Sequence, residues 1–238
     1  MVKFIDLSHS IEDGMITYPG LPGPKIQEHL SREDSKQHYA GGASFQIGKI
    51  EMVANTGTYI DAPFHRHKDG KDLSQLDMAS VANLDGVLLH ADPATRAISP
   101  DLIKGKDLKG KAVLIHTGWD RHWGFEPYFK DHPYLTRESA EYLKLEGATL
   151  VGIDSLNIDD NTDGTRPAHT ILLGGGIPIV EHLCNLDALP DNGFKFFAVP
   201  APVKGMGSFP VRAFATFEEV CLTQRRQGAK KGVEQIKS

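Results

Sequence analysis

Three continuous apolar runs constrain the fold of this chain more strongly than any other feature. They cover residues 86–92 (GVLLHAD), 111–118 (KAVLIHTG) and 148–154 (ATLVGID). Runs of this kind are typical of strands that are covered on both faces, as in a parallel sheet. A helix is predicted over residues 136–147, because Thr136 can cap its first turn and Gly147 can end it. A helix followed directly by a buried strand indicates an α/β domain.

Weaker patterns fill in the rest of the chain. Further strands are predicted over residues 44–53, 176–183, 194–200 and 211–220. Gly48 is expected to break the first of them, and shorter helices are predicted over residues 72–83 and 167–176. Because strands outnumber helices and many are too far apart for hairpins, we expect a mixed sheet. No repeat or linker interrupts the pattern, so we expect one domain over residues 1–223 and a polar, basic tail over residues 224–238.

Composition excludes several classes of function. The chain of 238 residues has a net charge of −5 and a pI of about 6.1, so it offers no general attraction to nucleic acids or anionic membranes. No apolar run approaches the roughly 20 residues that span a bilayer, and the N-terminus lacks the apolar segment of a signal peptide. Cys184 and Cys221 lie in no disulfide or metal pattern, so we expect reduced thiols and a cytoplasmic protein.

The segment NTGTYIDAPFHRH, residues 55–67, concentrates polar side chains of catalytic type. Gly57 and Pro63 make a helix unfavourable here, so we expect a strand that ends in a turn. Pro63 can redirect the chain so that His65 returns toward Asp61. A carboxylate and an imidazole that converge on one cavity suit metal binding or proton transfer. Taken alone, the segment favours a solvated loop, because isolated pairs of aspartate and histidine are common.

A second segment, residues 166–183 (RPAHTILLGGGIPIVEHL), favours the functional interpretation. It places His169 in a predicted helix and Glu181 at the end of an apolar strand. Glutamate is rarely buried unless it is paired or bound to a metal. Asp154 likewise follows an apolar run, and residues at the ends of such strands often form the functional sites of α/β proteins.

These segments, together with others, resemble those of a known family. The matching segments are DLSHSIEDGMITYPG (residues 6–20), NTGTYIDAPFH (residues 55–65), LIHTGW (residues 114–119), VGIDSLNID (residues 151–159) and FPVRAFA (residues 209–215). In this order they resemble the metal-dependent cyclase family of hydrolases, which includes bacterial kynurenine formamidases and isatin hydrolases. The second segment follows the family signature HxGTHxDxPxH at Gly57, Thr58, Asp61, Pro63 and His65.

The resemblance implies a fold, an assembly and a class of reaction. The fold is a single α/β domain of the swivelling β/β/α type, with mixed β-sheets and a few helices. Members of the family assemble as homodimers or homotetramers and bind zinc or manganese. They hydrolyse amide-type bonds of small molecules, formamides or strained lactams. The resemblance therefore implies hydrolysis of an amide, lactam or lactone bond with metal-bound water as the nucleophile.

The resemblance also assigns roles to residues at matching positions. Asp61, His169 and Glu181 keep the ligands of one ion, and His65 keeps the acid/base position. Asn55 and Tyr59, however, stand where the signature has two histidines that bind the other ion. An amide oxygen is a weak ligand, and a phenol with a pKa near ~10 ionises only when strongly activated. We expect this other ion to be absent or weakly held, with Asn55 at most a weak ligand.

Three interpretations of this departure remain open. In the first, a single divalent ion, zinc or manganese, remains at Asp61, His169 and Glu181. In the second, His38 or His67 rebuilds the lost half of the site. In the third no metal binds, and the polar residues form a metal-free enzyme or a non-catalytic binding site.

The first interpretation defines a mechanism and a pocket. His65 would move the proton between water and leaving group, and the neutral Tyr59 hydroxyl would donate to the oxyanion. We expect Tyr18, Trp119 and Trp123 to line the substrate pocket, because aromatic side chains suit flat or apolar ligands. Trp119 and Trp123 are equally compatible with core packing. Arg66 and His67 could bind a substrate carboxylate or could be solvated loop residues.

Overall fold

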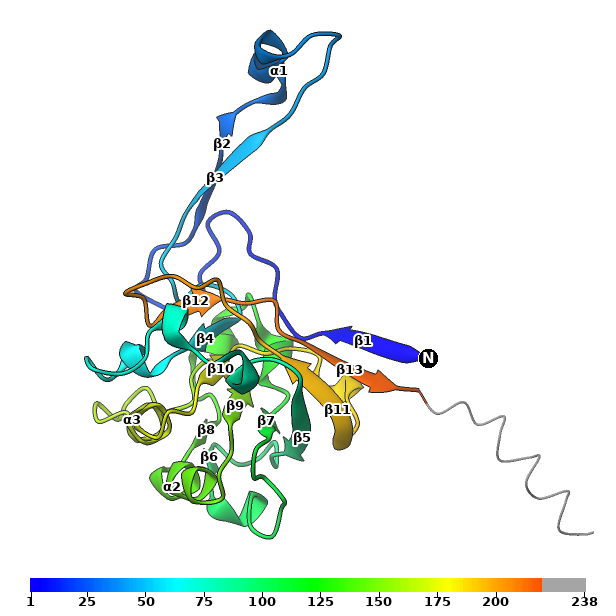
Figure 1. The fold of residues 1–238 in the computed structure, drawn as a ribbon. Coiled ribbons are helices and arrows are strands. Elements are labelled where there is room, and N and C mark those ends of the chain that lie inside the picture. The colour runs from blue at the N-terminus through cyan, green and yellow to red at the C-terminus, as the bar shows by residue number, and fades with distance from the viewer. Residues whose placement is uncertain (220–238) are drawn as a thin grey trace, which may run out of the picture.

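The fold is known from a computed structural model that describes residues 1–219. Residues 220–238, which include Cys221 and the predicted basic tail, lie outside the described part. Within it the chain forms a single α/β domain around one curled, mixed sheet of nine strands (Figure 1). This confirms the fold class that the sequence predicts. None of the helices in residues 1–219 has the length and apolar character needed to cross a membrane.

The nine strands are arranged in an order that differs from their order in the chain. From one edge to the other they are β1 (Val2–Asp6), β13 (Phe214–Glu218), β11 (Asn192–Phe197), β5 (Leu84–His90), β7 (Ala112–His116), β9 (Leu150–Ile153), β10 (Ile179–Glu181), β4 (Tyr59–Asp61) and β12 (Ser208–Pro210). Strands β5, β7, β9 and β10 are parallel, and the flanking strands pair antiparallel. The three apolar runs that opened the sequence analysis thus form the parallel centre.

Both faces of this centre are buried, as continuous apolar runs require. Leu88 and Leu114 pack into a cluster on one face with residues of β4, β11 and β13. Their neighbours Leu89 and Ile115 belong to a second cluster, which includes residues of helices α2 (Arg137–Leu145) and α3 (Pro167–Gly174). Successive residues of a strand point to opposite faces, so each strand contributes to both clusters.

The helix predictions are confirmed in two cases and wrong in one. Helix α2 begins after Thr136, whose side chain accepts a hydrogen bond from Ser139 N, and α3 matches the second prediction. Residues 72–83 form two 3₁₀ turns, Leu73–Gln75 and Met78–Ser80, instead of a helix. The side chains of Asp72 and Asp77 each accept local backbone hydrogen bonds, and this favours short capped turns over a continuous helix.

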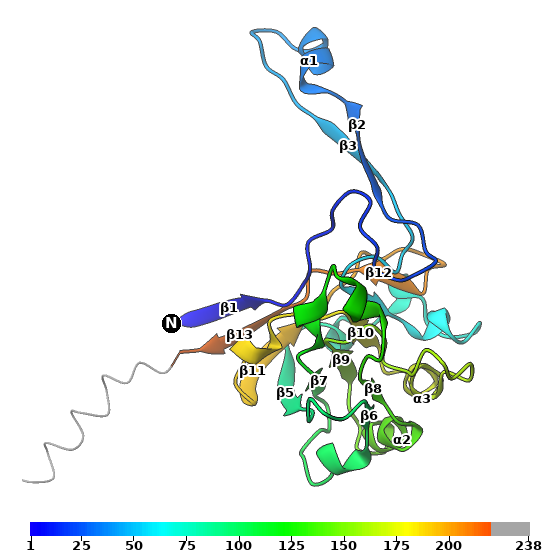
Figure 2. The ribbon, with the colours of Figure 1, turned by 180° about the vertical axis from the view of Figure 1, so that it is seen from behind.

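A long hairpin projects from the domain. It consists of β2 (Lys25–Leu30) and β3 (Ile47–Glu51), with the short helix α1 (Arg32–Ser35) near its tip, and it stands away from the body in both views (Figures 1 and 2). Gly48 lies inside β3, so the predicted break at this residue is wrong. The irregularity falls on the partner strand, between Glu28 and Leu30. The two-stranded pair β6 (Ala97–Ile98) and β8 (Tyr134–Leu135) completes the strands.

Pairing at one edge of the sheet brings distant residues together. Strand β4 lies between β10 and β12 and is antiparallel to both. Its register sets Tyr59 opposite Glu181, and Asp61 opposite both Ile179 and Ser208. The predicted site residues Tyr59, Asp61 and Glu181 therefore meet on neighbouring strands beside helix α3.

Candidate functional site

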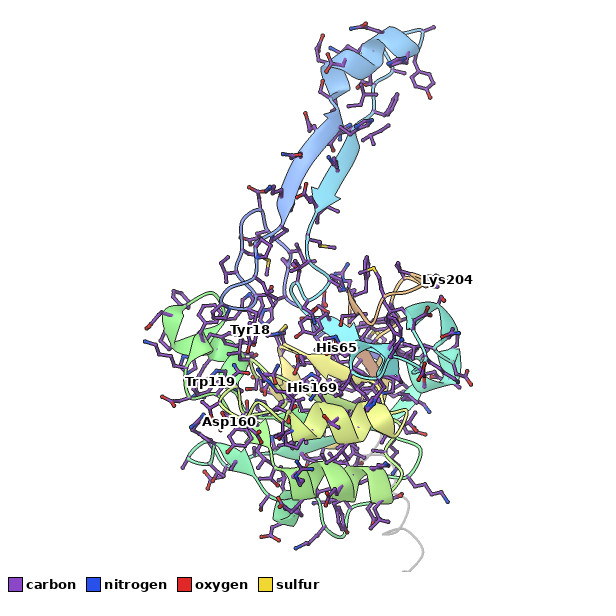
Figure 3. All side chains as sticks on the ribbon, turned by 90° about the vertical axis from the view of Figure 1, so that its left-hand side faces the viewer. Tyr18, His65, Trp119, Asp160, His169 and Lys204 are labelled. Carbon is purple, nitrogen blue, oxygen red and sulfur yellow. The ribbon has the colours of Figure 1, made fainter. Side chains whose placement is uncertain are left out.

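A cavity of about 320 Å³ opens beside β4, β10 and α3. It is lined by six of the residues that the sequence predicts for the site, Tyr18, Asn55, Tyr59, His65, His169 and Glu181. Figure 3 shows Tyr18, His65 and His169 near one another on the body of the domain, at the base of the hairpin. The fold thus gathers the candidates from residues 18–65 and 169–181 at a single place.

His169 is held in one orientation by a residue that the sequence analysis did not select. Asp159 accepts hydrogen bonds from the backbone N–H groups of Ala168 and His169, and from His169 Nδ1 at 2.7 Å. Because a carboxylate can only accept, the Nδ1 atom carries the proton. A carboxylate behind an imidazole is the usual way in which proteins orient a histidine that binds a metal.

Two buried carboxylates face the other nitrogen of His169. Its Nε2 atom lies 3.5 Å from Asp61 Oδ2 and 3.7 Å from Glu181 Oε1. Both acids have no exposed surface, and Asp61 Oδ2 has no hydrogen-bond partner among the described residues. Acceptor atoms that converge in this way repel one another unless a positive charge lies between them. The charge can be a cation, or a second proton on His169.

The pKa values of the site also indicate that a positive charge is required between the two carboxylates. Burial disfavours the charged imidazole, but the Glu181 carboxylate and the hydrogen bond to Asp159 outweigh it and raise the pKa of His169 to about 10. Burial raises the pKa of Glu181 to about 7. Without a metal, an imidazolium at His169 therefore supplies the missing charge.

The donor set also fits a divalent metal ion. Asp61, His65 and His169 each offer a ligand atom, and these atoms lie within 4.8 Å of one another. Glu181, the third ligand that the resemblance implies, is not in this group, although its Oε1 lies 3.7 Å from His169 Nε2. One or two imidazoles with carboxylates are the ligands that zinc and manganese accept, and an unpartnered buried oxygen at Asp61 is a ready ligand.

Tyr59 and Asn55, which stand where the resemblance implies two histidines, both line the cavity. The Tyr59 hydroxyl donates to Glu181 Oε2 at 2.5 Å. Burial, and then the charges of Glu181 and Asp61, raise the pKa of Tyr59 well above its usual value of 10, so the phenol stays neutral. A neutral phenol that already donates to Glu181 is a poor metal ligand and has no second proton for an oxyanion. In this structure Tyr59 therefore positions Glu181, which differs from its predicted role as an oxyanion donor.

The alternative histidines do not replace the lost ligands within the described chain. His38 lies in the 3₁₀ turn Lys36–His38 near the tip of the projecting hairpin. His67 Nε2 lies 3.0 Å from the carbonyl oxygen of Thr170. Among residues 1–219, Asp61, His65 and His169 form the one group of three potential ligands.

Ser208 links His65 to Asp61, and the sequence analysis did not select it. Its hydroxyl donates to Asp61 Oδ1, so it accepts from His65 Nδ1 at 2.9 Å. His65 Nδ1 therefore carries a proton, so in a neutral imidazole the lone pair would be on Nε2. A neutral imidazole in this tautomer is suited to accept a proton.

The predicted aromatic pocket is only partly present. Tyr18 lines the cavity, whereas Trp119 and Trp123 are not among the residues that line it. Trp123 stacks on His9, with ring centroids 3.9 Å apart, and Trp119 Nε1 donates to the carbonyl oxygen of Tyr128. Figure 3 shows Trp119 to one side of the cluster of Tyr18, His65 and His169. The structure favours packing as the role of both tryptophans.

Asp154 has a structural role next to the site. It is fully buried and accepts hydrogen bonds from Thr117 N, Thr117 Oγ1 and Gly118 N. Burial is the main cause that raises the pKa of Asp154 to about 7. The carboxylate ties the end of β7 to the end of β9, so it holds these two parallel strands together.

Comparison with known proteins identifies the relatives of this architecture. The family model described as Cyclase matches residues 5–160. Kynurenine formamidase of Geobacillus thermodenitrificans is 32% identical over 90% of this chain and 97% of its own, and kynurenine formamidase of Bacillus cereus is 29% identical over 89% and 96%.

Solved structures show the same fold. Isatin hydrolase A from Labrenzia aggregata, bound to benzyl benzoate, superposes with a TM-score of 0.79 at 22% identity, covering 92% of this chain and 94% of its own. A protein described as a potential metal-dependent hydrolase with cyclase activity superposes with a TM-score of 0.76 at 24% identity, covering 92% and 100%. With a family model that matches more than half of the chain and a relative above 30% identity along nearly all of it, this protein belongs to the cyclase family and is a hydrolase of that family.

Proposed function

We propose that this protein is a divalent-metal-dependent hydrolase that cleaves an amide, lactam or lactone bond in a small molecule. The observation that carries the proposal is the convergence of His169 Nε2, Asp61 Oδ2 and Glu181 Oε1 next to the cavity. The relatives named kynurenine formamidase and the solved isatin hydrolase support the amide class of substrate. The cavity volume of about 320 Å³ lies at the lower end of the usual range for small-molecule pockets, so it suits a small amide, lactam or lactone.

Each residue has a defined part in this reaction. Asp61, His169 and Glu181 would hold a zinc or manganese ion, which supplies Lewis-acid activation of a carbonyl and of water when it is bound. His65 accepts the proton of the attacking water at Nε2 and returns it to the leaving nitrogen or oxygen. Ser208 and Asp61 hold His65 in the required tautomer. Tyr59 orients Glu181 through its hydroxyl.

A metal-free site is the second candidate, and one observation favours it. The pKa of His169 rises to about 10 in the metal-free protein, so its imidazolium can occupy the place of a cation between the two carboxylates. The replacement of two signature histidines by Asn55 and Tyr59 points in the same direction. Such a site would bind a small molecule or perform acid/base chemistry without an ion.

Metal analysis separates the two candidates. We expect protein purified without added metal and then equilibrated with zinc or manganese to retain about one ion per chain, because Asp61, His169 and a third nearby donor, Glu181 or His65, are available as ligands. The chelated protein should lose hydrolysis of aryl formamides and lactams and regain it with metal. His169→Ala should hold no ion, whereas the control His67→Asn should hold one. Activity that survives complete removal of metal would contradict the proposal and favour the metal-free site.

We propose that the projecting hairpin assembles the protein into a homo-oligomer, a dimer or a tetramer. All eleven residues of β2 and β3 except Leu30 are exposed, and the cross-strand pair Ile26 and Ile50 is 47% and 48% exposed. A two-stranded hairpin is marginally stable alone, so an arm that carries exposed isoleucines is stabilised when another surface covers it. A second copy of the chain is the partner always present at matching concentration, and closed symmetry buries both arms equally.

Sedimentation measures this assembly. We expect the wild-type chain to sediment as a dimer or tetramer at micromolar concentration. Ile26→Lys combined with Ile50→Glu should increase the fraction of monomer by at least about tenfold, because it removes apolar area from the covered surface and buries two charges. Met78→Lys, which alters an exposed apolar residue of the body, is the matched control. A wild-type monomer, or an unchanged assembly in the hairpin variant, would contradict the assignment.

A further inference from the structure

Arg166 is placed in the cavity by an unusual backbone conformation. It immediately precedes α3 and adopts φ 47° and ψ 63°, in the left-handed region, which is strained for a residue other than glycine. Its side chain lines the cavity together with that of Tyr18. Strained residues of this kind are found where the surrounding structure fixes a side chain for function.

The guanidinium is fixed by neutral oxygens. Nη1 donates to Asn157 Oδ1 at 3.0 Å and to Asn161 Oδ1 at 2.7 Å, and Nη2 donates to the Tyr18 hydroxyl at 3.3 Å. The ion pairs found in residues 1–219 include none at Arg166, although Arg96 and Arg212 each pair with an aspartate. Because a guanidinium has five donor hydrogens, the donors on Nε and Nη2 are not all used.

Arg66, the arginine that the sequence analysis considered for a substrate carboxylate, is engaged differently. Its Nε donates to Thr170 Oγ1 and its Nη2 to the carbonyl oxygen of Thr165. These bonds tie the turn after β4 to the start of α3. Arg66 is exposed, whereas Arg166 is half-buried and Asn157 beside it is buried. Arg166 is therefore the more buried of the two arginines that line the cavity.

We propose that Arg166 binds a carboxylate of the substrate and that the enzyme prefers amides, lactams or lactones that carry this group. The inference rests on the proposed function, because it assigns the substrate class of the same cavity. A planar guanidinium fork matches a carboxylate through two parallel hydrogen bonds. Arg166 and Tyr18 line the same cavity as His65, His169 and Glu181, so one small molecule can present its carboxylate to Arg166 and its scissile carbonyl to the candidate catalytic group.

Matched substrates test this specificity. The two substrates are an aryl formamide that carries a carboxylate on its ring and the same formamide without the carboxylate. Arg166→Gln should lower kcat/KM for the acid on the order of 10- to 100-fold, mainly through KM, because it removes a hydrogen bond between charged groups. Its kcat/KM for the neutral formamide should stay within about threefold. Arg66→Gln, which also removes a cation from the cavity, should not select between the two substrates.

Asn161→Asp provides a variant that keeps the arginine. The new carboxylate would lie where Asn161 Oδ1 now accepts from Arg166, so it pairs with the guanidinium and competes with the substrate. We expect the preference for the acid to fall while the fold is retained. Wild-type protein that hydrolyses both formamides equally, or Arg166→Gln and Asn161→Asp variants that retain the wild-type preference, would overturn the inference.

Calorimetry distinguishes a failure of this inference from a failure of the proposed function. The probe is the ring-carboxylate amine that hydrolysis of the acidic formamide would release, titrated into wild-type and Arg166→Gln protein. If neither formamide is hydrolysed, the proposed function fails. The titration then tests by itself whether Arg166 binds a carboxylate. Binding that disappears in Arg166→Gln supports a carboxylate site, and equal binding or no binding by the two proteins overturns it.

Discussion

Asp61→Asn is expected to lower kcat/KM by about 10³-fold or more and to weaken metal binding sharply, while the protein stays folded. Loss of a group that only supports a metal ligand already costs about 10- to 100-fold, and Asp61 is a candidate ligand itself. Its Oδ2 atom is buried, lies 3.5 Å from His169 Nε2 and has no hydrogen-bond partner among residues 1–219. An amide at this position removes the negative charge and leaves an NH₂ group in place of the ligand oxygen.

The fold should tolerate this exchange because asparagine has nearly the shape of aspartate. Its Oδ1 can still accept the hydrogen bond that Ser208 donates to Asp61. The measurements are kcat/KM for an aryl formamide, the zinc content after dialysis, and the circular dichroism melting curve. Asp160→Asn, the same chemical change at a half-buried loop carboxylate that accepts from Thr162, is the control. An Asp61→Asn enzyme with normal turnover and normal zinc content would refute the assigned site.

The fold could be predicted from the sequence where one pattern dominates. The continuous apolar runs specified the parallel centre, since few other structures bury both faces of a strand. Thr136 and Gly147 marked the ends of α2 because capping chemistry is local. Residues 72–83 were wrongly predicted as a helix, because apolar spacing there competes with the capping side chains of Asp72 and Asp77. In the projecting hairpin, β3 falls within the strand predicted over residues 44–53, whereas β2 was not predicted. The exposed residues of β2 lack the alternation that a buried face imposes.

The candidate site was predictable to the extent that its residues belong to recognisable motifs. His65, His169 and Glu181 stand in such motifs and line the cavity. Ser208 could not be inferred, because its position opposite Asp61 depends on the pairing of β12 with β4, which lie far apart in the sequence. Arg166 is the first residue of the segment 166–183, yet its role depends on a backbone angle and on hydrogen bonds to Asn157, Asn161 and Tyr18.

Asp61 is assigned as a metal ligand and His65 as the acid–base group, so their substitutions should have different effects. His65→Ala is expected to lower kcat by about 10²- to 10⁴-fold, the usual contribution of a general acid–base group, with little change in metal content. The Ser208 hydroxyl donates a hydrogen bond to Asp61 and accepts one from His65 Nδ1. In this tautomer the lone pair of the neutral imidazole is on Nε2, where it can accept a proton. Ser208→Ala should lower kcat about tenfold, less than His65→Ala, because it removes only the bond that fixes the tautomer.

The metal content of His65→Ala shows whether His65 acts as a base or as a metal ligand, because the structure allows both roles. His65 offers a ring nitrogen within 4.8 Å of the ligand atoms of Asp61 and His169, so it could serve as a third ligand instead of a base. If it is a base, His65→Ala keeps about one zinc per chain and loses turnover. If it is a ligand, zinc content and turnover fall together, and Glu181→Gln then leaves more zinc bound than His65→Ala does. Turnover that stays at the wild-type level in His65→Ala would remove His65 from the mechanism.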